Sequence, residues 1–179
     1  SANCGYGAQV GQIGLGTMEM DEDERYLYVV NLFNNSVVKI DSDNPQVNTT
    51  QTFLIPNPSC SFNDFAVFAM KFYNNELYVG VTCTAETSKD LADRSFHVYK
   101  MNPVNGSLSL IFSTDYVKGV WDNSNLNQVE TQWLKDIEFT DEGNMVLGIG
   151  DRVGDTFCNQ ATSRVDDQFG DILLVYNDN

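Results

Sequence analysis

The feature that most limits what this chain can fold into is a pattern of short alternating segments that occurs three times along its 179 residues. Each copy opens with a segment in which apolar residues recur at every second position, so that they fall on one face of a β-strand. A short polar turn and a second apolar segment follow. The opening segments are Thr17-Met18-Glu19-Met20, Ala69-Met70-Lys71-Phe72 and Asp136-Ile137-Glu138-Phe139.

Each copy continues with a third segment that has a polar end, and the first two copies add a fourth, which starts at Thr52 and Leu108. Repeats of about 50 to 70 residues built from antiparallel strands are typical of propeller blades, which bury their faces against their neighbours. We therefore predict an all-β fold, a β-propeller of about three antiparallel blades that belong to a larger or incomplete ring. The chain forms a single propeller segment over residues 1–179, with blades at about 14–56, 64–113 and 132–179.

Charge excludes several classes of partner. The formal net charge is −15 at pH 7, whereas binding to nucleic acid or to an anionic membrane needs clustered Lys and Arg. No apolar stretch approaches the roughly 20 residues that span a bilayer. Divalent cations or basic partners fit the charge better, although acidity alone also keeps an exposed protein soluble.

Four widely spaced cysteines indicate an oxidising compartment. Cys4, Cys60, Cys83 and Cys158 form no C-x-x-C pair, and a structural zinc site needs four convergent ligands. Two disulfides in an extracellular or cell-surface protein fit better than buried reduced thiols in a cytosolic one. Antiparallel strand directions place Cys60 beside Cys83, which leaves Cys4 for Cys158, although the sequence alone permits three pairings.

The connections differ between the two ends of the predicted blades. Turns between first and second strands are short and polar, as at residues 74–75 and 141–143. Connections at the opposite end, which carries the cysteines, are long; they cover residues 57–64, 82–94, 115–132 and 150–170. Long loops on a rigid scaffold commonly carry binding groups. We expect a protein, a glycan or another copy to bind at this long-loop end; loops without a ligand are the alternative. Three incomplete blades cannot close a ring and leave an open edge, so we also expect the rest of a longer chain, or another copy, to complete the array.

A group of aspartates in the last long loop is a candidate calcium site. Asp151, Asp155, Asp166 and Asp167 lie in a segment that also contains Gly150, Gly154 and Gly170, and carboxylates on an irregular loop can converge on Ca²⁺. Their spacing does not match an EF-hand. Plain solvated loops are the simpler interpretation of the same residues.

Aromatic residues in this region provide a candidate ligand site. Trp121 and Trp133 flank a segment rich in Asn and Gln, a mixture that suits stacking on a sugar ring and hydrogen bonding to its hydroxyls. With Arg152 they are our candidate ligand-binding residues. The alternative is that both indoles pack at blade junctions. Triplets beginning at Asn34, Asn48 and Asn105 match the N-glycosylation pattern.

Catalytic signals are weak. A Ser/His/Asp mechanism would depend on His97, which lies in an alternating strand segment and fits a structural histidine better. Asp136 and Glu138 share one strand face, so an alternative function is part of a calcium-dependent six-bladed hydrolase or lactonase with Glu138 on the metal. Glu19 and Lys71 stand at positions equivalent to Glu138, and this mixture of signs favours ion pairing.

The residues also carry a resemblance. The runs 16–32, 78–88, 136–139 and 148–152 resemble the β-propeller region of large secreted bacterial surface proteins, many of which also carry SdrD-type B domains. The resemblance covers nearly the whole chain and implies an extracellular role in adhesion or surface assembly, without catalytic residues. The leading hypothesis is therefore a non-catalytic extracellular module that binds a partner through its long loops.

Overall fold

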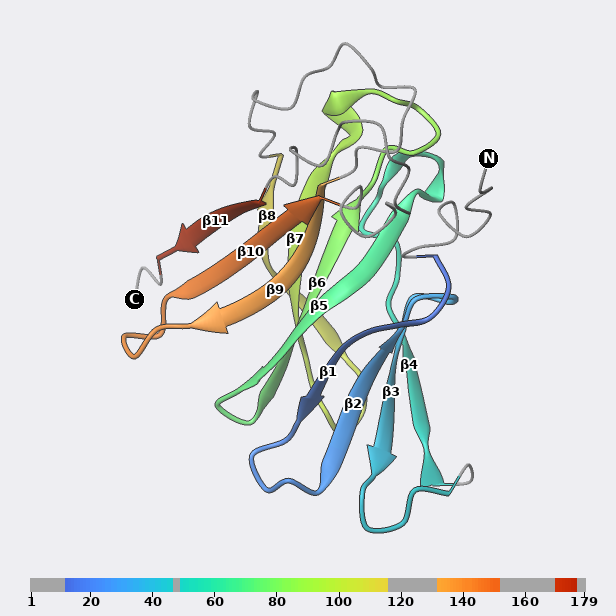
Figure 1. The fold of residues 1–179 in the computed structure, drawn as a ribbon, viewed down its shortest axis with the longest axis vertical. Helices are drawn as coiled ribbons and strands as arrows, with labels where there is room; N and C mark the ends of the chain where they lie inside the picture. The colour runs from blue at the N-terminus through green and yellow to red at the C-terminus, as the bar shows by residue number, and fades with distance from the viewer. Residues whose placement is uncertain (1–11, 47–48, 116–131, 152–169, 177–179) are drawn as a thin grey trace, which may run out of the picture.

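A computed structural model describes residues 12–46, 49–115, 132–151 and 170–176, which form three antiparallel β-sheets without an α-helix (Figure 1). In each sheet the strands are hydrogen-bonded in the order in which they occur along the chain. The all-β prediction is confirmed. Within these residues there is no helix long and apolar enough to cross a membrane.

The sheets follow one another along the sequence. The first sheet comprises β1 (Leu15–Met20), β2 (Tyr26–Asn31), β3 (Ser36–Asp41) and β4 (Gln51–Leu54). The middle sheet comprises β5 (Phe65–Tyr73), β6 (Glu76–Cys83), β7 (Ser95–Met101) and β8 (Leu108–Thr114). The third sheet comprises β9 (Gln132–Phe139), β10 (Met145–Asp151) and β11 (Gly170–Val175).

The sheets contact one another mainly through their opening strands. β1 lies beside β5, and β5 lies beside β9, while the later strands spread outward (Figure 1). One apolar cluster fills the space between the first and middle sheets, and a second fills the space between the middle and third sheets. The middle sheet is therefore buried on both faces, because alternate residues of its strands point into different clusters.

A bulge recurs at the same place in all three opening strands. Between Leu15 and Met18, β1 has one residue more than the facing part of β2. The same surplus lies between Val67 and Met70 in β5, and between Leu134 and Ile137 in β9. A bulge increases the local twist of a strand. The pairing of the first and second strands therefore has the same register in all three sheets, just as their sequence pattern is the same.

Each bulge in β5 and β9 receives a side chain from the preceding sheet. The Val67 amide donates to Oδ1 of Asn35 at 3.2 Å, and the Asn35 side-chain amide donates to the Phe65 carbonyl at 3.1 Å. At the equivalent position in β9, the Leu134 amide donates to the Thr82 hydroxyl at 2.9 Å. Since a bulge leaves backbone groups without ladder partners, these side chains satisfy them and join adjacent sheets.

The last strand pairs with β10 along its whole length, from Gly170 opposite Gly150 to Val175 opposite Met145. The connection from β3 to β4 runs over residues 42–50 at the end of the sheets that carries the short turns, so that end is not formed by tight turns alone.

Candidate binding face

A disulfide marks one end of the middle sheet. Cys60 and Cys83 are joined with an S–S distance of 1.96 Å, and both are buried. This is the pair that antiparallel strand directions predicted. The bond ties the segment before β5 to the end of β6. We call this end of the three sheets, where β1, β3, β5, β7, β9 and β11 begin, the cystine rim.

A hollow of about 220 Å³ opens on the cystine rim between the first and middle sheets. Its lining is mixed, with aromatic, amide and carboxylate side chains. Phe33, in the turn between β2 and β3, is 75% exposed. The other lining residues include Leu32, Asn63, Asp64, Glu86 and Trp133.

Most polar groups of this hollow already have protein partners. Both carboxylate oxygens of Asp64 accept hydrogen bonds from Thr87, one from its amide and one from its hydroxyl. Glu86 accepts from the Gln12 side chain at 2.9 Å. The hollow is thus a preformed surface, because its carboxylates hold the loop that follows β6.

Trp133 contributes to this lining from the start of β9. It is only 2% exposed and packs edge-on against Phe68, with the ring centroids 5.8 Å apart. This is the packing role at a sheet junction that the sequence left open as an alternative. The exposed aromatic ring of the hollow is instead that of Phe33, which the sequence analysis did not single out.

Several candidate residues lie outside the described part of the chain. They are the ligand candidates Trp121 and Arg152, the calcium candidates Asp155, Asp166 and Asp167, and the cysteines Cys4 and Cys158. Asp151 is the last residue of β10, where its backbone pairs with Gln132. Since β10 ends and β11 begins on the cystine rim, the connection that contains the calcium candidates leaves from this rim and returns to it.

A second polar cluster lies where the opening strands meet. Nζ of Lys71 on β5 and Oε1 of Glu138 on β9 are 2.8 Å apart. This hydrogen bond raises the pKa of Lys71. Burial raises the pKa of Glu19 on β1, while the nearby Lys71 ammonium opposes that rise. Lys71 and Glu138 thus form an ion pair between two sheets, in line with the mixture of signs at these positions, and the charges of Glu19 and Lys71 act on each other.

No group of three or more His, Cys, Asp or Glu side chains in the described ranges is arranged to hold a metal ion. Glu138, the residue that the hydrolase alternative places on calcium, is bound to Lys71. The ammonium group of Lys71, on the middle sheet, therefore already balances the negative charge of Glu138 on the third sheet.

His97 is a buried strand histidine. Its Nε2 lies 2.8 Å from the Ser95 hydroxyl, and its Nδ1 lies 3.1 Å from the Ser113 hydroxyl. Burial lowers its pKa, and the negative charge of Asp115 acts in the opposite direction. Both ring nitrogens have neighbouring partners within the sheet, which fits a structural role.

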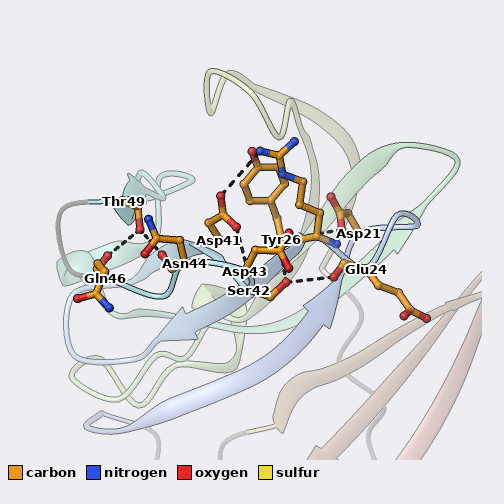
Figure 2. A network of polar contacts seen from close by, with 10 residues as sticks. Asp21, Glu24, Tyr26, Asp41, Ser42, Asp43, Asn44, Gln46 and Thr49 are labelled. Atoms are coloured by element: carbon orange, nitrogen blue, oxygen red, sulfur yellow. Dashed lines mark hydrogen bonds and ion pairs between the residues drawn. The ribbon is translucent and has the colours of Figure 1, made fainter.

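Acidic residues at the opposite end of the first sheet stabilise turns. Asp21 accepts hydrogen bonds from the amides of Arg25 and Tyr26 at 2.7 and 2.9 Å, and the Ser42 hydroxyl donates to the Arg25 carbonyl at 2.7 Å (Figure 2). Asp41 accepts from the amide of Asp43 at 3.1 Å. These side chains hold the turns at this end of the first sheet in place.

Comparison with known proteins assigns neither a family nor a function to the chain. No protein-family model and no curated protein matches the chain. One solved structure to which it is similar is titled "Streptogramin B lyase structure", with 12% sequence identity and a TM-score of 0.43. The likeness covers 94% of this chain but 42% of the other, so the chain spans less than half the length of that structure. A likeness of this degree assigns neither an activity nor a substrate.

Proposed function

We propose that this chain is an extracellular, non-catalytic β-propeller segment of about three blades from a larger or incomplete ring, which binds a protein or glycan through its cystine rim. Three meandering sheets whose opening strands lie side by side support the propeller assignment. The Cys60–Cys83 bond supports an oxidising compartment. The resemblance to secreted surface proteins supports a role in adhesion or surface assembly.

The observation that carries the proposal is the hollow on the cystine rim. It combines the exposed ring of Phe33 with carboxylate and amide groups held in place by neighbouring loops. Ligand sites usually combine an apolar surface with a few fixed polar groups, and an aromatic ring next to hydrogen-bonding groups suits a sugar. The described strands on either side of Trp121, Arg152 and the calcium candidates end or begin at the same rim, which keeps these residues among the candidates for ligand binding.

No specific observation favours the hydrolase or lactonase alternative. Its proposed metal ligand, Glu138, is paired with Lys71. We retain Ca²⁺ in the proposal because of the negative net charge and the candidate aspartates. It would bind to the long loops and not to the opening strands.

The test has two steps. An immobilised glycan array first identifies the glycans that bind the chain. The isotopically labelled chain is then titrated with those glycans, and NMR records the chemical shifts of its amides. We expect amide shifts at residues around Phe33 and Asn63, and binding more than tenfold weaker for Phe33→Ala. Phe62→Ala is the matched control, because Phe62 is 71% exposed but does not line the hollow. Equal losses in both variants, or shifts confined to the opposite end of the sheets, would contradict binding at the hollow.

A further inference from the structure

The two sides of each sheet pack against different neighbours. We call the side that faces the preceding sheet the leading face, and the side that faces the following sheet the trailing face. Met70 of the middle sheet lies on the leading face, in the cluster shared with the first sheet. Ile137 of the third sheet lies on the leading face, in the cluster shared with the middle sheet. Val37 and Val98 lie on the trailing faces of the first and middle sheets.

The leading face of the first sheet has no preceding sheet within the described residues. Met18 is the equivalent of Met70 and Ile137, because each lies opposite the same position of the second strand, at Val29, Val79 and Leu147. Met70 and Ile137 are 0% exposed, whereas Met18 is 56% exposed. On the same face Met20 and Leu54 are 39% and 68% exposed, whereas Leu27, Val38 and Ile40 are half-buried and Val29, opposite Met18, is buried.

The trailing face of the third sheet shows the complementary situation. Ile172 lies opposite Gly148, which corresponds to the pairing of Val37 with Val30 and of Val98 with Gly80. Val37 and Val98 are 0% exposed, whereas Ile172 is 75% exposed and Leu174 is 41% exposed. This chain therefore presents one apolar leading face and one apolar trailing face, each equivalent to a face that is buried elsewhere in the same molecule.

We infer that the trailing face of the third sheet in one copy binds the leading face of the first sheet in another copy, so that chains associate head to tail. Both junctions inside the chain already pack a trailing face on a leading face, and the intermolecular contact continues that arrangement. A contact between unlike faces is heterologous, so it forms rings or open chains instead of a two-fold dimer. The inference does not depend on ligand binding at the cystine rim.

Size and charge set the expected strength. Strands about six residues long in sheets of three or four strands give a face of roughly 20 by 15 Å, which is smaller than the roughly 800 Å² per partner of a standard interface. Each copy carries a net charge of −15, so the copies repel each other at low ionic strength. We expect micromolar association that strengthens when salt is added.

Sedimentation velocity over about 1 to 500 μM, a range that brackets micromolar affinity, tests the inference. The average mass of the 179-residue chain is expected to rise from 20.0 kDa with concentration, and to rise further in about 0.5 M NaCl, where charge repulsion is screened. A constant mass of one chain at all concentrations and both salt conditions would overturn the inference and leave these faces for a different polypeptide.

Two variants test the orientation. Met18→Lys places a charge on the leading face only, and Ile172→Lys does so on the trailing face only. Each variant alone is expected to associate more than tenfold more weakly, whereas an equimolar mixture forms a heterodimer, because each supplies the intact face that the other lacks. Lys makes an acidic chain less negative, so general charge repulsion cannot explain a loss of association.

The controls separate folding from binding. Val104→Lys changes a residue that is 75% exposed in the turn between β7 and β8 and lies on neither face, so its association is expected to match that of the unchanged chain. Thermal unfolding checks that every variant is folded, and Met20→Lys or Leu174→Lys replaces a variant that is not. A mixture that stays monomeric, or single variants that associate normally, would contradict the head-to-tail contact.

Discussion

Met70 in the middle sheet and Met18 in the first sheet occupy equivalent positions but have opposite environments. Each is the first paired residue after the bulge in its opening strand, and each lies opposite a valine of the second strand. Met70 is 0% exposed and Met18 is 56% exposed. The difference arises because the first sheet covers the leading face of the middle sheet, whereas no described residue range supplies a sheet for the leading face of the first.

This contrast shows what an alternating pattern determines. The pattern fixes which side chains share a face, since side chains alternate across a strand. Burial of that face depends on a neighbouring sheet. The same strand pattern therefore produces a core residue in one sheet and an apolar surface residue in another.

The largest expected effect comes from truncating the buried methionine. Met70→Ala should lower the free energy of unfolding by about 2 to 5 kcal/mol, because it removes core contacts and leaves a cavity. Met18→Ala should change it by about 0.5 kcal/mol or less, as exposed substitutions usually do. Urea denaturation of dilute samples measures both. Similar losses in the two variants would contradict the assigned difference between the faces.

The disulfide is expected to come next. Replacing both Cys60 and Cys83 with Ala removes a crosslink between residues 23 apart and should cost about 3 kcal/mol, because the unfolded chain gains entropy. Urea denaturation compares this double variant with the unchanged chain under oxidising conditions. A loss below about 1 kcal/mol would show that the bond adds little to the stability of the middle sheet.

A glycine pair sharpens the comparison of trailing faces. A Cβ at Gly80 would lie 2.7 Å from Cδ2 of Leu134 in the third sheet and 2.9 Å from Cβ of Ala69, so Gly80→Ala should destabilise the fold by about 1 to 3 kcal/mol. At the equivalent Gly148, a Cβ would approach only Asp136 of its own sheet, at 3.1 Å.

Gly148→Ala is the matched control for this substitution. It should cost less than Gly80→Ala, because no described sheet covers that face and Ala restricts the unfolded chain more than Gly does. Thermal unfolding compares the two variants. A greater loss for Gly148→Ala would mean that the trailing face of the third sheet is covered within a single chain.

The smallest expected effect concerns the ion pair between the middle and third sheets. Side chains of Lys71 and Glu138 are 25% and 51% exposed, so Lys71→Met should cost less than about 1 kcal/mol at neutral pH. The hydrogen bond to Glu138 raises the pKa of Lys71 above its ordinary value of 10.5. The contribution of the charged Lys71 to the free energy of unfolding is therefore complete below pH 10.5. It is lost as pH rises through the higher pKa that Lys71 has in the folded state.

Urea denaturation of both proteins across pH 8 to 11.5 tests this sign. The stability difference between the unchanged chain and Lys71→Met should be constant up to about pH 10 and then shrink. A difference that grows at high pH would contradict the stabilising role of the charged lysine.

The sequence predicted much of the fold because alternation and turn residues are local signals. Asn74 and Asn75 adopt positive φ in the turn between β5 and β6, as their residue type indicates. The Cys60–Cys83 pairing followed from strand direction. Bulges were not predicted, because an extra residue is defined only by the register of the facing strand.

The candidate site was harder to predict because its groups come from different sheets. Asn35 belongs to a glycosylation triplet in the sequence, but its side-chain amide group binds the backbone of β5. Phe33 had no distinguishing pattern, since its exposure depends on the turn that presents it. The aromatic ring of Trp133 packs on Phe68; a local sequence pattern cannot show this contact because Phe68 is on another sheet.

The most direct test of the central claim, that equivalent faces of the sheets differ only in whether a neighbour covers them, is solvent relaxation of methionine methyl groups by NMR with a soluble gadolinium probe. An Ile172→Lys background keeps the chains apart. The account predicts strong broadening of Met18 and Met20, and protection of Met70, Met101 and Met145. Equal protection of Met18 and Met70 would contradict it.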